Sequence, residues 1–166
     1  MPAEQFHAPA PTTPKPELYD DLASQLEGLL AGESDLIANT ANMAAVIYHG
    51  LPDLNWAGFY LMKDGELVLG PFQGKPACIR IPLGKGVCGT AAETRASQVV
   101  PDVHAFPGHI ACDAASRSEL VVPLVVGDQV IGVLDLDSPS PNRFDHLDRE
   151  GCEKLVSILI RHIQAD

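Results

Sequence analysis

Cys112 is the residue best placed for chemistry, because of the segment in which it lies. The segment HIACDAASRSELVVPL, residues 109–124, places this thiol among small and polar residues directly before an apolar run. Cationic neighbours such as Arg117, His104 or His109 favour the thiolate, which is the reactive form of cysteine. The alternative is that Cys112 packs as a small hydrophobic residue at the edge of a loop. These residues alone leave both interpretations open.

A redox-active thiol usually needs a second thiol to resolve its oxidised form. Cys78 and Cys88 are the candidates, because both are expected in loops or at strand ends near Cys112. Cys152 lies on the apolar side of an expected C-terminal helix, and we predict that it only packs. Structural disulfides are rare in a reducing cytosol, so these cysteines indicate redox chemistry, metal binding or packing.

Two carboxylates share one face of a predicted strand. Asp135 and Asp137 are two residues apart in IGVLDLDSP, so their side chains point the same way, and the rest of this run is apolar. Glu119 begins the strand expected to pair with this one. A like-charged pair there favours a bound cation, and we predict a pocket for a ligand amine in which one acid, protonated by burial, acts as a proton donor. The alternative is two solvated carboxylates at a strand end.

The sequence favours a metal site or a phosphate-binding loop less than it favours thiol chemistry. Three cysteines and two histidines could hold zinc, but the sequence has no closely spaced C-x2-C pair and no H-E-x-x-H, so we predict no metal. The glycines of LGKGVCGTAAE, residues 83–93, do not follow a phosphate-loop order. We expect a turn into a helix there, whose N-terminal amides favour an anion or a thiolate close to Cys88.

Periodicity predicts the elements that position these residues. Residues 1–16 are proline-rich and read as a flexible tail before one domain, residues 17–166. Helices are expected from Glu17 to Gly32, from the N-cap Ser34 to Gly50, and from about Asp145. Strands are expected at 56–62 and 66–70, at 76–83 and 97–103, and at 118–126 and 129–137. A loop of about 19 residues, 100–118, carries Cys112, and loops that long are more often functional than idle.

Hairpin-linked strands with helices at both ends predict an α+β domain with a central antiparallel sheet flanked by helices. The chain has 166 residues and a net charge of −11, which disfavours binding to nucleic acid or to an anionic membrane. No run is long and apolar enough to span a bilayer, and the N-terminus does not resemble a secretory signal. We therefore expect a cytoplasmic protein.

Several strings resemble one family. WAGFYL, IPLGKGVCGTAAET, VPDVHAFPGHIACDAASRSELVVPL and IGVLDLDSP followed by RFD are similar to the free methionine-(R)-sulfoxide reductases, which are single GAF-type domains. The resemblance covers roughly residues 18–163 and includes three cysteines, Cys78, Cys88 and Cys112. It leaves out the proline-rich tail and Cys152.

The resemblance implies reduction of the R epimer of free methionine sulfoxide, without a cofactor. It implies that Cys112 is the nucleophile, that Cys78 is the principal resolving cysteine, and that Cys88 is a further redox cysteine. The implied substrate-binding residues are the acids Glu119, Asp135 and Asp137 for the amino group and the sulfoxide oxygen, and the aromatic residues Trp56 and Tyr60 for the methyl end. Thioredoxin would reduce the resulting disulfide, and a homodimer is left open. The alternative is a GAF-type domain that binds a small ligand or senses redox state.

Overall fold

Six antiparallel strands form one sheet in a computed structural model that describes residues 6–110 and 112–164. Their order across the sheet is β3-β2-β1-β6-β5-β4. In chain order they are β1 (Trp56–Lys63), β2 (Glu66–Gly74), β3 (Arg80–Pro82), β4 (Gln98–Val100), β5 (Ser118–Val126) and β6 (Gln129–Ser138). Both predicted hairpins are confirmed, and β1 and β6 pair in the middle of the sheet. This arrangement confirms the predicted α+β architecture.

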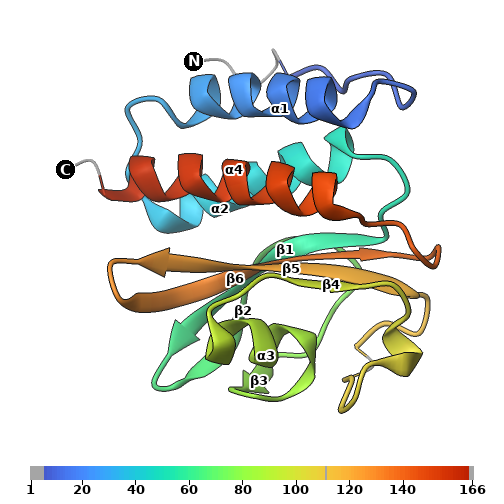
Figure 1. The fold of residues 1–166 in the computed structure, drawn as a ribbon. Helices are drawn as coiled ribbons and strands as arrows, with labels where there is room; N and C mark the ends of the chain where they lie inside the picture. Colours follow the sequence, from blue (N-terminus) through green and yellow to red (C-terminus); the bar gives the residue numbers. More distant parts are fainter. Residues whose placement is uncertain (1–5, 111, 165–166) are drawn as a thin grey trace.

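Three helices lie on one side of the sheet, two of them against the strands and the third packed on those two, and one short helix lies on the other side (Figure 1). The three are α1 (Lys15–Leu30), α2 (Leu36–Gly50) and α4 (His146–Gln164), and the short one is α3 (Gly86–Thr94). α1 begins at Lys15, two residues before the expected start at Glu17, because the first turn of a helix tolerates a proline such as Pro16. α2 is capped by Asp35, which accepts a hydrogen bond from the Ala38 amide (2.8 Å), so the predicted N-cap Ser34 is wrong by one residue.

The central strands divide their side chains between two different environments. Leu120, Leu134 and Leu136 are fully buried in the large apolar core beneath the three-helix layer. Val121 and Val133 face the other way, into a smaller core with residues of α3. Because side chains alternate along a strand, Glu119 and Asp135 share this second side. The smaller core therefore contains the acids that the sequence singled out.

The segment 100–118 is anchored at several points. A short 3-10 helix, Val103–Ala105, interrupts it, and the Val103 amide donates to the Arg117 carbonyl (2.8 Å). The Arg117 amide in turn donates to the Ser138 carbonyl of β6 (2.8 Å). The connection that carries Cys112 is thus tied to the sheet on the side of α3.

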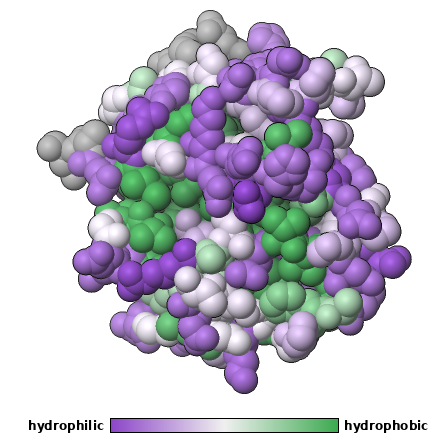
Figure 2. All heavy atoms as spheres, viewed as in Figure 1, coloured by the Kyte–Doolittle hydropathy of each residue, from purple (hydrophilic) through white to green (hydrophobic). Residues whose placement is uncertain are grey.

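Hydrophilic residues cover much of the surface in Figure 2, and hydrophobic residues come to this surface mainly where the helical layer meets the sheet. Among the described residues, the helices are too short or too polar for any of them to cross a membrane.

Candidate active site

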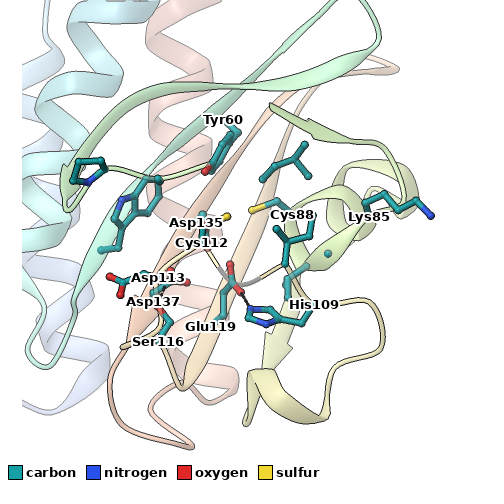
Figure 3. Close-up of a pocket in the computed structure, with 17 residues that line it drawn as sticks. Tyr60, Lys85, Cys88, His109, Cys112, Asp113, Ser116, Glu119, Asp135 and Asp137 are labelled. Carbon is teal, nitrogen blue, oxygen red and sulfur yellow. Dashed lines mark hydrogen bonds and ion pairs between the residues drawn. The ribbon is translucent and has the colours of Figure 1, made fainter. Parts of the chain in front are cut away.

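A pocket opens on the sheet face opposite the three-helix layer (Figure 3). The space between its lining atoms, including the open solvent at its mouth, is about 520 Å³. Seven of the eight predicted site residues line it: Trp56, Tyr60, Cys88, Cys112, Glu119, Asp135 and Asp137. The eighth, Cys78, is bonded to Cys112 at its edge. The fold therefore gathers residues from β1, β5, β6, α3 and the loop 100–118.

Three carboxyl groups meet on the floor of the pocket. Glu119 on β5 is the register partner of Asp137 on β6. Asp135 precedes Asp137 by two residues on the same strand, so its side chain lies on the same face. Glu119 and Asp135 are 7% and 6% exposed. Burial, reinforced by the charges of the neighbouring acids, raises the pKa of Glu119 and of Asp137 well above the ordinary range. Burial also raises the pKa of Asp135, against hydrogen bonds from its neighbours. The strand-end alternative of solvated carboxylates is therefore wrong.

Among the described residues, no lysine or arginine forms an ion pair with these acids. In the part of the chain that the structure describes, the nearest basic group is His109, whose Nε2 lies 4.0 Å from Glu119 Oε1 (Figure 3). Burial and the neighbouring His104 lower the pKa of His109, which disfavours its charged form. The Oδ1 atoms of Asp135 and Asp137 are buried without a hydrogen-bond partner among the described residues. A buried acid without a partner is costly, so the pocket is suited to a cationic ligand.

A disulfide joins Cys78 to Cys112, with the two Cα atoms 5.4 Å apart. The Tyr60 hydroxyl donates a hydrogen bond to the Cys78 carbonyl (2.9 Å), which holds this segment against β1. Arg117, expected beside the Cys112 thiol, is exposed and does not line the pocket. The ring of His109 lines it instead, and that of His104 does not.

Cys88 differs from the expectation based on its helix. It lies in the first turn of α3, but burial and the charges of Asp135 and Glu119 raise the pKa of its thiol well above the usual range. Burial and these acids therefore oppose the thiolate that the N-terminal amides of the helix were expected to favour near Cys88. Cys152 is also buried and packs in the large core, as predicted.

Stacked aromatic rings form one wall of the pocket. Trp56 stacks on Tyr60 and on Phe72, with ring centroids 5.9 and 5.2 Å apart. Its indole Nε1 donates to the Lys75 carbonyl (3.1 Å), which fixes the orientation of the ring. The wall offers an apolar surface to the uncharged part of a ligand.

Asn55, Ser116 and Asp113 were not singled out by the sequence reasoning. The Asn55 side-chain amide donates to Asp113 Oδ2 and to Ser116 Oγ, each at 3.1 Å. The Ser116 hydroxyl donates to Asp137 Oδ2 at the same distance. This chain of hydrogen bonds orients Asp137. The only sequence signal for it is the position of Asn55 directly before Trp56.

Comparisons with known proteins agree with this geometry. The family model described as GAF domain matches residues 39–161. The free methionine-R-sulfoxide reductase of Escherichia coli (strain K12) is 56% identical over 145 residues, which cover 87% of this chain and 88% of that protein. An X-ray structure of a free methionine-R-sulfoxide reductase from Neisseria meningitidis, in complex with its substrate, has a TM-score of 0.91 at 45% identity, covering 96% and 95% of the two chains. A putative GAF sensor protein from Burkholderia vietnamiensis has a TM-score of 0.88 at 62% identity, covering 92% and 97%.

Proposed function

The chain belongs to the GAF domain family, in the group that contains the free methionine-R-sulfoxide reductases, and from this we propose that it reduces the R epimer of free methionine sulfoxide to methionine. One observation carries the proposal: a disulfide, Cys78–Cys112, lies at a pocket whose floor holds two buried acids and a partly buried one, none paired with a lysine or arginine among the described residues. Such a site combines a two-electron redox pair with recognition of an amine.

The acids bind the substrate's ammonium group in this proposal. A free amino acid carries a cationic α-amino group, with which Glu119, Asp135 and Asp137 in the pocket would pair. A methionine sulfoxide residue inside a peptide has an uncharged amide at the same position. It would leave the buried carboxyl groups without a partner, so the pocket selects the free amino acid. Trp56 and Tyr60 would contact the methyl end.

The reduction is a thiol reaction with two stages, oxygen transfer to Cys112 and disulfide formation with Cys78. The Cys112 thiolate attacks the sulfoxide sulfur, an acid of the pocket protonates the oxygen, and the oxygen passes to Cys112 as methionine leaves. The substrate sulfur gains two electrons, and Cys112 becomes a sulfenic acid. The raised pKa values of Glu119 and Asp137 support a proton donor among these groups. Cys78 then attacks the sulfenic sulfur, which forms the disulfide and releases water.

Thioredoxin completes the cycle. Its dithiol reduces the Cys78–Cys112 disulfide to two thiols and is itself oxidised to a disulfide. We place this cycle in the cytoplasm, where thiols are kept reduced. Cys88 is proposed as a further redox cysteine that can relay or resolve. Cys88 lines the pocket and forms no disulfide, which is consistent with that role.

A stereochemical assay tests the proposal. Reduced protein is supplied with dithiothreitol and with the R or S epimer of free methionine sulfoxide, and methionine is measured by chromatography. We expect consumption of the R epimer only, and no turnover of an N-acetylated or peptide-bound sulfoxide. Equal turnover of the free and the N-acetylated substrates would contradict the role of the acids.

A redox-sensing or ligand-binding domain is the second candidate. The Burkholderia vietnamiensis neighbour is named a putative GAF sensor protein, and a reversible disulfide at a pocket would also suit a sensor. The same assay separates the two, because a sensor would bind its ligand without converting it over many turnovers.

A further inference from the structure

Three potential metal ligands lie together at the base of the pocket. Cys88 Sγ and one carboxylate oxygen each of Glu119 and Asp135 lie within 4.8 Å of one another, and all three residues are buried. They come from three separate elements, α3, β5 and β6. His109 Nε2 lies 4.0 Å from Glu119 Oε1, so an imidazole is within reach of the same group.

These donor types fit a thiophilic divalent cation. Thiolate, carboxylate and imidazole are the ligands that zinc takes in proteins, and a tetrahedral ion places neighbouring donor atoms about 3.3–3.8 Å apart. The donor atoms of Cys88, Glu119 and Asp135, which lie within 4.8 Å of one another, would have to close to such spacings around a bound ion. The site is not the zinc arrangement considered from the sequence, since Cys78 and Cys112 are bonded to each other.

An independent feature of Asp135 also indicates a missing ligand. This residue is 6% exposed and lines the pocket, and its Oδ1 is buried without a hydrogen-bond partner among the described residues. A native protein rarely leaves such an atom without a bonding partner. The atom can bind an ammonium group or a metal ion, and the neighbouring Cys88 sulfur is a further donor that a metal ion would use.

We propose that Cys88, Glu119 and Asp135 form an inhibitory site for Zn²⁺ or Cd²⁺, which remains available when Cys78 and Cys112 are joined in the disulfide. Binding converts the Cys88 thiol to a metal-bound thiolate and releases its proton to solvent, with no change in oxidation state. His109 or water completes the coordination. The consequence for catalysis rests on the proposed function: a metal held here occupies the acids that would otherwise bind the substrate's ammonium.

Cadmium binding to the oxidised full-length protein tests the site. In the disulfide form Cys88 and Cys152 are the two free cysteines, so the ultraviolet thiolate-to-cadmium absorption band reports on them alone. We expect one Cd²⁺ per chain and the band in wild type, its loss in Cys88→Ser, and its retention in Cys152→Ser as the matched control. Glu119→Gln should weaken binding by at least about tenfold, since even outer-shell changes cost about 10–100-fold.

Three results would overturn the site: no band in the wild-type disulfide form, an undiminished band in Cys88→Ser, or equal loss in Cys152→Ser. A second arm tests the link to catalysis in the Cys78→Ser/Cys112→Ser double variant, which keeps only the two buried thiols. Free methionine-R-sulfoxide should weaken Cd²⁺ binding there. Cadmium binding that is unaffected by the sulfoxide would uphold the metal site and contradict the proposed substrate pocket.

Discussion

Acidic side chains are buried at two places in this protein, with opposite surroundings. Between α1 and α4, Asp148 is fully buried and accepts hydrogen bonds from Lys15 Nζ (2.7 Å), Tyr19 Oη (2.7 Å) and Arg143 Nη1 (3.3 Å). On the other side of the sheet, Glu119 and its two neighbouring aspartates have no lysine or arginine within ion-pair distance among the described residues.

This difference in pairing indicates a different role for each cluster. A buried charge that only holds helices together is best paired within the chain, because an unpaired one opposes folding. A buried group of acids that lacks a cation gains its partner from outside, which is what a binding site requires. The paired cluster therefore stabilises the helical layer, and the unpaired one is available to a ligand.

The largest expected effect is a difference in activity between variants of two cysteines that lie on opposite sides of the sheet, Cys112 and Cys152. Cys112→Ser should lower the rate of methionine formation by on the order of 10³-fold or more, because the variant lacks the proposed nucleophile. Cys152→Ser lies in the large core and should leave the rate per folded molecule unchanged. The measurement is single-turnover methionine formation from the R sulfoxide. Comparable activity in the two variants would contradict the assignment of Cys112.

The second effect is on stability, in the paired cluster. Asp148→Asn removes the charge that compensates Lys15 and Arg143, and we expect a loss of about 3 kcal/mol in the free energy of unfolding. Activity per folded molecule should stay at the wild-type level. Urea unfolding of the oxidised protein measures the change. An unaltered midpoint would show that this cluster does not stabilise the helical layer.

The third effect is the converse, in the pocket. Asp135→Asn removes one acid from a group that has no lysine or arginine partner among the described residues, so the free energy of unfolding should stay the same or rise. The KM should increase about 10–100-fold, because the loss of a charged hydrogen bond to the substrate costs about 1.5–3 kcal/mol. Together with Asp148→Asn, this variant forms a reciprocal pair in which one variant loses stability and the other loses affinity. A KM within twofold of wild type would make Asp135 a structural residue.

The smallest effect is a difference in pH dependence. In the folded state, the pKa values of Glu119 and Asp137 lie above their ordinary values of 4.5 and 3.8. Between the ordinary and the raised pKa the folded state therefore binds more protons than the unfolded state, so stability falls as pH rises through this range. Asp145, in the paired cluster, behaves oppositely: its pKa is lowered to about 2 despite some burial, through hydrogen bonds from Lys15 and the Asp148 amide, so its contribution is lost as pH falls from 3.8 toward 2.

Unfolding free energies between about pH 5 and about pH 8 check this expectation. Wild type should lose more stability with rising pH than Glu119→Gln, because the variant lacks one of the carboxyl groups whose pKa is raised by folding. Parallel curves for the two proteins would show that the buried acids do not govern stability in this range.

Local patterns were sufficient for much of the fold. The alternation along residues 118–137 predicted both the hairpin and the shared face of Asp135 and Asp137, because a strand repeats every two residues whatever surrounds it. The positions near helix ends were less secure. Ser34 and Asp35 are both good N-caps, and only the backbone conformation at Asp35 decides which one accepts the Ala38 amide.

Predictions about ionisation depended on burial and were less successful. Cys88 does lie in the first turn of a helix, as its glycine-rich segment indicated. Its thiol is nevertheless surrounded by acids from β5 and β6, which disfavour the thiolate more than a short helix favours it. Arg117 is close to Cys112 in sequence, but the loop directs it to solvent.

The sequence by itself determined the elements, the candidate thiols and the acids, because these follow from residue type and short-range spacing. Only the tertiary structure decided that Cys78 lies beside Cys112, that the acids are buried without a cation, and that Asn55 and Ser116 orient Asp137. Those contacts join segments separated by 18 to 61 positions in the chain. Their distances depend on how the sheet and loops pack, which no local pattern contains.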